Sequence, residues 1–420
     1  MTFKFLHCAD LHLDSPLVGL STRADAPTDR LRSATRRAMD NLVQYAIEEE
    51  VRFVVIAGDV YDGDWPDYTT GLFFNARMAE LGRAGIRVFL VSGNHDADSQ
   101  ITRHLVLPDN VTRFAVDHPQ THVIDELAVA MHGQGFARRE VRDNLVPAYP
   151  QPLPGYLNIG VLHAAVEGTG GHEAYAPCRL DDLTGKGYDY WALGHVHRRQ
   201  VLSKAPWVVY PGNLQGRHIR EQGPKGAMVV QVSGRDVLPR FVPLDVVRWH
   251  ECRVNLTDAE TDADFFERVA AAVVEYTESS TLPLVLRMLL EGTSALHGTL
   301  LADRERYDNE IRNAVMAVAG DDRVWIEKVL VGTTPLAREQ RGLPAYDAMN
   351  LVAESLDRIE ADEAFLADFL RYARAIQARM GAYARAEETT GLADLNDVRS
   401  LLPETREFLT TRLTKGRRVR

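Results

Sequence analysis

Four residues with no packing purpose, Gly93-Asn94-His95-Asp96, follow directly after an apolar run over residues 88–91. The run is short and partly β-branched, so the pattern predicts a buried strand that ends at Gly93. Side chains just beyond the carboxyl end of such a strand project into the crevice where α/β proteins carry their chemistry. There Asn94 can offer a neutral oxygen to a metal ion, His95 can donate a proton near neutral pH, and Asp96 can orient the His95 ring.

Polar residues of the same kinds occur at four other places where a predicted strand ends. Together with the tetrapeptide they give eight candidate residues: Asp10, His12, Asp59, Asn94, His95, His163, His195 and His197. Mixed carboxylate, imidazole and amide ligands suit Mn, Fe or Zn, whereas Mg and Ca favour oxygen ligands alone. Seven of these residues could form two metal sites if one carboxylate bridged them, and Asp59 is the natural bridge. Two ions about 3.5–4 Å apart can clamp a phosphate and stabilise an in-line displacement, so the pattern predicts phosphoryl chemistry.

The elements that must position these residues alternate at the start of the chain. Apolar runs and amphipathic spacing predict a strand, a helix, a strand, a helix and a strand over residues 3–9, 31–50, 53–56, 67–84 and 88–91. This alternation is typical of a layered α/β domain. Later strands, with few helices between them, are predicted over residues 127–131, 156–162, 188–193, 207–210, 227–232 and 237–242. A second sheet packed against the first is the simplest account.

Two changes of pattern divide the remainder of the chain. The layered domain is expected to cover residues 1–245, a small α/β domain residues 246–335, and a charged helical tail residues 336–420. In the small domain, strands are predicted over 251–256, 284–290 and 324–331, and helices over 262–276 and 301–318. Apolar residues form a stripe along the tail, which suits either packing on its own domain or a partner helix or coiled coil.

Composition limits the class of protein. The chain of 420 residues is 45% apolar and 25% charged, and no apolar run approaches the roughly 20 residues of a membrane span. The three cysteines, Cys8, Cys178 and Cys252, are far apart and indicate neither a disulfide framework nor a cysteine zinc site. The first residues enter a strand without a signal-peptide pattern, so a cytoplasmic protein without membrane contact is expected. A net charge of −11 argues against a general nucleic-acid-binding surface but permits a local basic track.

The polar motifs, taken together, resemble the five-part signature of calcineurin-like metallophosphoesterases. They are Asp10-x-His12, Gly58-Asp59-x-x-Asp62, Gly93-Asn94-His95-Asp96, His163 and Gly194-His195-x-His197. The resemblance implies a four-layer α-β-β-α sandwich with one ion held by Asp10, His12, Asp59 and His197. It implies a second ion held by Asp59, Asn94, His163 and His195. It also implies that His95 is the general acid or transition-state stabiliser and that Asp96 orients it, with Asp62 in support.

Within that superfamily the chain looks most like the SbcD and YhaO branch of DNA repair exonucleases. The opening residues 5–14, the segment 210–221 and the small domain followed by a helical tail carry this resemblance. It implies a two-metal hydrolase that cleaves phosphodiester bonds in DNA, with Mn as the expected ion and Fe, Mg or Zn as alternatives. It also implies a homodimer whose tail docks on an SbcC-like coiled-coil ATPase.

Other interpretations stay open at this stage. A phosphatase or a small-nucleotide phosphodiesterase would use the same fold and metals, because function depends on the groove around the site. A metal-free scaffold is a third interpretation, and the complete ligand set argues against it. A basic cluster near the ligands could bind substrate phosphates or form a solvated loop, and its nominated members are Arg198, Arg217, His218 and Arg220.

Overall fold

The structure is a computed structural model of the chain, and it describes residues 2–15, 33–62, 68–98, 105–167, 175–320, 323–336, 347–379 and 394–415. The chain divides into two compact units, which are described separately below. One contains residues 1–250 and 282–285, and the other contains residues 251–281 and 286–420. Across the described residues, no helix is both long enough and apolar enough to cross a membrane.

A six-stranded sheet with its parallel strands in the middle positions the first half of the candidate residues. Its strands, in spatial order, are β12 (Asp236–Pro243), β11 (Gly226–Ser233), β1 (Thr2–Cys8), β2 (Phe53–Ala57), β3 (Arg87–Val91) and β4 (Val111–Arg113). Strands β1 to β4 run parallel, whereas β11 pairs antiparallel with β1. The carboxyl ends of β1, β2 and β3 therefore meet at one edge.

A second six-stranded sheet positions the remaining candidates. Its strands, in spatial order, are β5 (Gln120–Ile124), β6 (Val129–Gln134), β7 (Leu157–His163), β8 (Tyr190–Gly194), β10 (Trp207–Tyr210) and β9 (Gln200–Lys204). Strands β6, β7, β8 and β10 run parallel. The carboxyl ends of β7 and β8 therefore also lie together.

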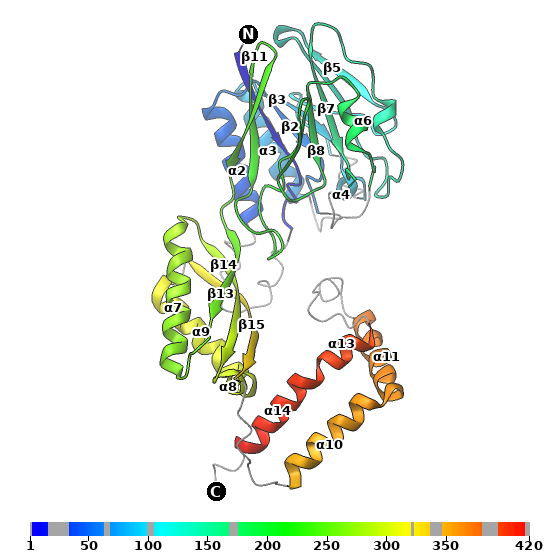
Figure 1. Ribbon diagram of the computed structural model, residues 1–420. Helices are drawn as coiled ribbons and strands as arrows, with labels where there is room; N and C mark the ends of the chain where they lie inside the picture. Colours follow the sequence, from blue (N-terminus) through cyan, green and yellow to red (C-terminus); the bar gives the residue numbers. More distant parts are fainter. Residues whose placement is uncertain are drawn as a thin grey trace. The chain divides into compact units, whose positions relative to one another are not determined.

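The predicted four-layer sandwich is confirmed. Helices α2 (Ala34–Glu48) and α3 (Thr69–Arg83) pack on the outer face of the first sheet, and α6 (Leu180–Thr184) covers the second (Figure 1). Phe5, Phe53 and Tyr190 belong to the apolar core between the sheets. Strand β2 is buried along its whole length, because both of its faces are covered. Burial on both faces explains why its sequence is continuously apolar.

The small α/β fold predicted after the sandwich has a three-stranded sheet. It consists of β13 (Arg248–Asn255), α7 (Asp262–Ser279), β14 (Leu284–Ser294), α8 (His297–Ala302), α9 (Arg304–Ala319) and β15 (Val324–Pro335). Helix α7 begins with a capping box in which Thr261 Oγ1 accepts a hydrogen bond from the Asp264 backbone N–H. The single helix predicted over 301–318 is wrong. The chain leaves helical geometry at Asp303, which has φ −131° and ψ 46°, and this separates α8 from α9.

The predicted tail is helical over its described residues. It contains α10 (Asp347–Ala361), α11 (Glu363–Arg379), α13 (Leu395–Ser400) and α14 (Leu402–Lys415). Leu366, Leu370 and Val398 form a small apolar core within the tail. Phe365 and Phe369 on α11 are exposed. The predicted apolar stripe is thus partly buried and partly open.

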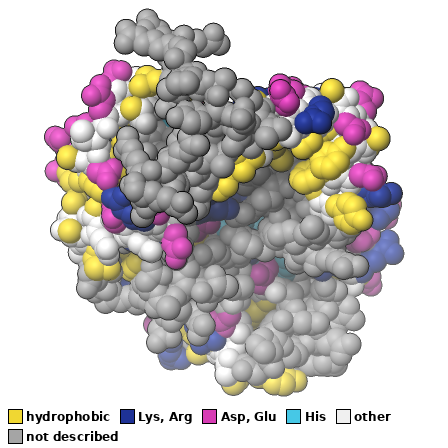
Figure 2. All heavy atoms as spheres, turned by 90° about the horizontal axis from the view of Figure 1, so that it is seen from below, with side chains coloured by type: hydrophobic (Ala, Val, Ile, Leu, Met, Phe, Trp, Pro, Cys, Tyr) yellow, Lys and Arg dark blue, Asp and Glu magenta, His cyan; other side chains and the backbone are white. Residues whose placement is uncertain are grey.

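Described acidic, basic and hydrophobic side chains are interspersed on the face shown in Figure 2.

A prediction about stability follows from the close approach of the two sheets beside the site. A Cβ atom added at Gly194, the last residue of β8, would lie 1.8 Å from the Ala57 carbonyl oxygen at the end of β2. We expect Gly194→Ala to lower the free energy of unfolding by about 1–3 kcal/mol, the usual cost of overpacking a rigid core. Urea denaturation of both proteins measures the difference. An unchanged midpoint would mean that these strand ends separate at no cost.

Candidate metal centre

The candidate residues lie where the carboxyl ends of the two sheets meet. Asp10 follows β1, Asp59 follows β2, and His163 is the last residue of β7. Two backbone hydrogen bonds hold the loops after β1 and β2 side by side, from Asp10 N–H to the Gly58 oxygen (3.0 Å) and from His12 N–H to the Asp59 oxygen (3.1 Å). The topology therefore brings together residues that are far apart in sequence.

Four candidate residues have left-handed backbone conformations that side chains other than glycine rarely adopt. The φ angles are 52° at Asp10, 42° at His12, 52° at Asp59 and 99° at His195. Such conformations cost about 1–3 kcal/mol each and gather at functional sites, where the surrounding structure enforces them. All four of these residues lie at the junction of the two sheets, in loops that follow strand ends.

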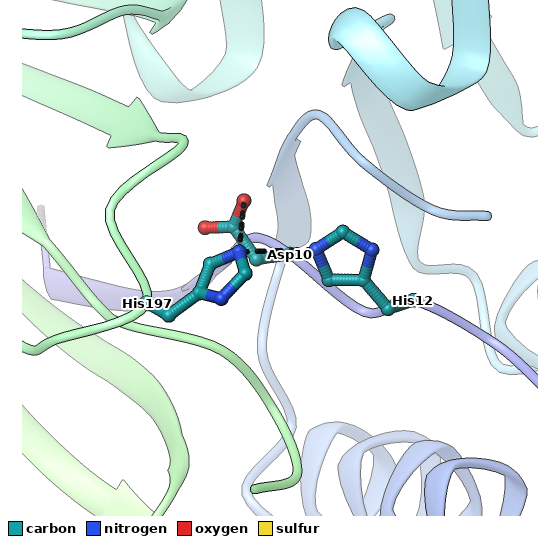
Figure 3. Close-up of side chains that lie close together, drawn as sticks. All are labelled: Asp10, His12 and His197. Atoms are coloured by element: carbon teal, nitrogen blue, oxygen red, sulfur yellow. Dashed lines mark hydrogen bonds and ion pairs between the residues drawn. The ribbon is translucent and has the colours of Figure 1, made fainter. Parts of the chain in front are cut away.

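Asp10, His12 and His197 converge on one point (Figure 3). His12 Nε2 lies 3.1 Å from His197 Nε2, and the latter lies 3.9 Å from Asp10 Oδ1. Burial lowers the pKa of both imidazoles, which favours the neutral form that binds metal ions. Two ring nitrogens and a carboxylate oxygen that face one another, with only His197 partly exposed, form a donor set suited to a divalent cation.

A second group consists of Asp10, Asp59 and His163. Asp59 Oδ2 lies 3.4 Å from His163 Nε2 and 3.9 Å from His12 Nε2, so this carboxylate reaches both groups. Asn94, at the start of α4 (Asn94–Asp98), places its Oδ1 3.0 Å from His163 Nε2. Asp10 is common to both groups. The predicted bridging role of Asp59 fits these distances and stays a prediction.

Charge in the second group is balanced between carboxylate and imidazole. Burial acts to lower the pKa of His163, but the adjacent Asp59 carboxylate outweighs it and raises this pKa to about 9. Burial raises the pKa of Asp10 to about 6. A bound cation would replace the imidazolium proton as the partner of these carboxylates. The group therefore has the electrostatic character of a cation site.

His195 is buried beside the second group. Its backbone N–H lies 3.1 Å from both carboxylate oxygens of Asp10, which fixes the Asp10 side chain. Its ring centroid lies 5.1 Å from that of His163. The structure thus brings all seven predicted ligands to one junction, although it assigns none of them to an ion.

His95 lies at the edge of this junction, with part of its side chain open to solvent. Its ring centroid is 5.0 Å from that of His12. Asp96 is predicted to orient this ring, and that role stays a prediction. The Asp96 carboxylate accepts hydrogen bonds from the backbone N–H groups of Val60, Tyr61 and Gly93. These bonds anchor the loops after β2 and β3, so Asp96 supports the backbone of the site.

Asp62 is the carboxylate beside the His95 ring. Its Oδ1 lies 3.3 Å from His95 Nδ1 and 3.3 Å from His12 Nδ1. A carboxylate in this position can hold a proton on Nδ1 of the imidazole and so leave Nε2 to face the site. Asp62, which the sequence suggested only as support, is thus a carboxylate that lies beside Nδ1 of both rings.

Comparison with known proteins gives this geometry a family. Residues 3–199 match the family model described as calcineurin-like phosphoesterase, and residues 249–341 match the metallophosphoesterase YhaO middle domain. The chain is 34% identical over 294 residues to the uncharacterized metallophosphoesterase YhaO of Bacillus subtilis, covering 69% of this chain and 72% of that protein. The chain belongs to the calcineurin-like metallophosphoesterase family. It is therefore a metal-dependent phosphoesterase, a hydrolase that uses divalent ions.

More distant relatives of this metallophosphoesterase carry names from DNA repair and nuclease function. The DNA double-strand break repair protein Mre11 of Sulfurisphaera tokodaii is 20% identical over 322 residues, covering 73% of this chain and 78% of that protein. The SbcD component of the nuclease SbcCD from Staphylococcus saprophyticus is 23% identical over 279 residues, covering 58% of this chain and 70% of that protein. The predicted resemblance to the SbcD and YhaO branch is thus confirmed.

The predicted substrate-binding residues of the metallophosphoesterase divide into two kinds. Arg198 and Arg220 are exposed and His218 is half-buried, and all three line a pocket of about 530 Å³ beside His197. Arg217 also lines this pocket, but its side chain is buried and its guanidinium contacts protein groups. Its donors are already engaged, so the structure favours an internal role for Arg217 over the predicted phosphate contact.

Sequence reasoning missed one buried residue at the centre. Glu221 Oε1 lies 2.7 Å from His197 Nδ1. Although burial opposes its ionisation, the charge of Arg217 and the hydrogen bond with His197 hold the pKa of Glu221 well below its usual value. The only sequence signal was its place in the segment 210–221, four residues after Arg217.

Proposed function

We propose that this metallophosphoesterase is a two-metal-dependent nuclease that hydrolyses phosphodiester bonds in DNA, with Mn²⁺ as its ion and exonuclease action as its mode. The observation that carries the proposal is that two of the three candidate donor groups among the described residues share Asp10, and that all their members except the partly buried His197 are buried. The DNA substrate is supported by two relatives whose names specify DNA repair or nuclease function and whose matches are longer than the phosphoesterase segment 3–199. Two metal ions suit a phosphodiester because both the attacking and the leaving oxygen need stabilisation.

The proposed ligand sets extend the two groups of the site and share Asp59 in place of Asp10. Asp10, His12, Asp59 and His197 would hold one ion, and Asp59, Asn94, His163 and His195 would hold the other. When bound, the ions supply charge neutralisation for the phosphate and an activated water. The mixed nitrogen and oxygen donors, two of them carboxylates, suit Mn²⁺ and also permit Fe or Zn.

His95 is proposed to act on the leaving group. Asp62 lies beside its Nδ1, so Nε2 is the nitrogen available to face the substrate. A proton held on Nε2 can pass to the departing oxygen or stabilise negative charge on it. The partial exposure of the ring gives a polymer substrate access to this atom.

The pocket beside His197 is proposed to receive the phosphate backbone. Arg198 and Arg220 supply positive charge at its surface, and His218 adds a donor. Contacts of this kind position nucleic acid without reading its sequence. They also fit an overall acidic chain, because attraction is needed only along the track.

The deciding experiment is degradation of linear duplex DNA labelled at either end, with Mn²⁺ as the added ion. A phosphate monoester and a cyclic dinucleotide are tested alongside. Progressive loss of duplex DNA supports the nuclease, and the order in which the two labels are lost gives its polarity. Hydrolysis of only a small ester would retain the family assignment and overturn the DNA proposal.

Metal binding is expected to stabilise the folded chain. A ligand that binds only the native state adds about 2.7 kcal/mol when its free concentration is 100 times Kd. We therefore expect Mn²⁺ to raise the thermal midpoint of the unit that contains the metal centre and a chelator to reverse the rise. Calorimetric scans with and without Mn²⁺ measure this change. A thermal midpoint that is unchanged in millimolar Mn²⁺ would contradict the proposed metal centre.

The tail is proposed to dock on an SbcC-like coiled-coil ATPase, and the chain is proposed to form a homodimer. Phe365, Phe369 and Tyr372 are exposed along one side of α11, which supports an apolar contact. We expect replacement of these three residues by serine to abolish copurification with the co-expressed ATPase. Leu238→Ser, at an exposed apolar residue of β12, is the control and should not affect it. Equal recovery of the ATPase with both variants would exclude this surface.

A further inference from the structure

The loop after β10 carries Glu221, whose carboxylate contacts the proposed metal ligand His197 at the ring nitrogen that faces away from the other ligands. Glu221 Oε1 lies 2.7 Å from His197 Nδ1, on the side of the ring opposite Nε2. A carboxylate oxygen and an imidazole nitrogen at this distance need a proton between them, since two lone pairs would repel. Arg217 Nη2 also approaches Nδ1, at 3.2 Å, but that contact is longer. The geometry therefore favours a proton on Nδ1 that is donated to Glu221.

Arg217 joins this carboxylate to another one. Its Nη2 lies 3.1 Å from Glu221 Oε1, and its Nη1 lies 3.5 Å from Asp62 Oδ1. Nη1 also donates to the hydroxyl of Ser15, which in turn donates to Asp62 Oδ2 at 2.7 Å. Asp62 lies beside the rings of His12 and His95, as described above. One buried guanidinium thus connects the carboxylates behind the proposed metal ligands His197 and His12.

The loop that carries these two residues is rigidly held. Glu221 Oε2 accepts hydrogen bonds from the Arg217 backbone N–H (2.7 Å) and from Asn213 Nδ2 (2.8 Å). The buried Trp249 donates from its Nε1 to the Gly216 oxygen (3.0 Å). A Cβ atom at Gly216 would lie 2.7 Å from the backbone carbonyl oxygen of Glu221, so the tight turn requires glycine. This anchoring suits a loop that must hold the His197 ring within tenths of an ångström of one position.

We propose that Glu221 and Arg217 are positioning residues of the metal centre. Glu221 fixes the tautomer and orientation of His197 so that Nε2 faces Asp10 and His12. Arg217 compensates the charges of Glu221 and Asp62 and couples the carboxylate that orients His197 to the one that lies beside His12. Carboxylates of this kind orient imidazole ligands and raise their basicity, and their loss commonly weakens metal binding about 10–100-fold. The inference extends the proposed function, on which its metal-binding arm rests.

The first test uses the unaltered protein and needs no metal. Nitrogen NMR of ¹⁵N-histidine-labelled chain, with His197→Gln to assign the signal, reports which ring nitrogen carries the proton. The expected state of His197 is the tautomer protonated at Nδ1. Protonation at Nε2 in the neutral ring would overturn the role given to Glu221. The protonation state is read from the wild-type spectrum, and His197→Gln serves only to assign the signal.

The second test measures Mn²⁺ binding alone by isothermal titration calorimetry. Glu221→Gln keeps the shape of the side chain and removes its charge, and it is expected to weaken Mn²⁺ binding about 10–100-fold. Arg217→Met is expected to weaken it as well, with Arg217→Lys restoring part of the loss. The matched control is Glu327→Gln, which removes a carboxylate from Arg287 Nη2 (2.6 Å) in the other unit. It should leave Mn²⁺ affinity unchanged.

The outcomes separate the inference from the proposed function. Wild-type Mn²⁺ affinity retained in Glu221→Gln and Arg217→Met would overturn the positioning role and leave the metal centre standing. Absence of Mn²⁺ binding by the wild type would overturn the proposed metal centre, while the NMR measurement would still decide the Glu221–His197 pairing. Equal loss of affinity in the Glu327→Gln control would mean that general destabilisation is the cause, which also overturns the inference.

Discussion

Asp59→Asn is expected to lower kcat/KM for phosphodiester hydrolysis by about 10³-fold, because each lost 1.36 kcal/mol of transition-state stabilisation costs a factor of ten and a metal ion supplies several kcal/mol. Asp59 Oδ2 reaches histidines of both donor groups, so its loss affects both proposed ions. Asp59 Oδ1 also accepts the backbone N–H of His95 (3.0 Å). Initial rates on a chromogenic phosphodiester and elemental analysis for Mn measure the two effects.

The control for this substitution is Asp245→Asn. Asp245 is also a buried aspartate, paired with Arg248 Nε at 2.9 Å, and it belongs to neither donor group. Its replacement should lower stability without changing Mn content or rate per folded molecule. If Asp59→Asn keeps both Mn content and rate, Asp59 is not a bridging ligand.

His95→Asn is expected to lower kcat by about 10²- to 10⁴-fold, the usual contribution of a general acid, while the Mn content stays that of the wild type. The side chain lies at the edge of the site, and Asp62 Oδ1 lies 3.3 Å from its Nδ1. A loss in kcat with little change in KM would place His95 in the chemical step. Single-turnover degradation of duplex DNA measures that step directly.

His118→Asn is the matched control for this prediction. His118 also lies beside an aspartate, with Nδ1 2.9 Å from Asp117 Oδ1, but it is exposed and outside the described donor groups. It should leave the rate unchanged. Loss of bound Mn in His95→Asn would instead mean that His95 helps to hold an ion, which would contradict its assignment to proton transfer.

The layered fold could be predicted because its signals are local. A run such as 53–56 is short and fully apolar, and the residue types that follow it do not suit a core. Chain order then places such strand ends on one edge of a sheet. The seven proposed ligands could therefore be nominated together, and the structure brings them to one junction.

Short and edge elements could not be predicted in the same way. The sequence pattern does not predict strands β4, β5 and β9, and each is the outermost strand at one edge of its sheet, with mostly half-exposed residues. Such strands have no continuous apolar run and weak alternation. The break at Asp303 was also missed, since the sequence around it has amphipathic spacing on both sides.

The partners of the candidate side chains were beyond sequence reasoning. Asp96 adjoins His95 in the chain, yet Asp62 adjoins it in space. Glu221 reaches His197 across 24 positions, because β9 and β10 intervene and the following loop returns to the site. Proximity in sequence points only to Asp96, and the contacts of Asp62 and Glu221 are identified by the tertiary structure alone.

The left-handed backbone at Asp10, His12, Asp59 and His195 lowers the stability of the fold at residues that the proposed activity needs. Glycine adopts such conformations without steric cost. Replacing one of these residues by glycine would therefore remove backbone strain from the loop, and it would also remove a donor atom. A variant without hydrolytic activity would then have a higher thermal midpoint than the active protein. Laboratory evolution of this chain for heat resistance without added metal ion would consequently favour loss of these residues, and any such selection needs a concurrent screen for hydrolysis.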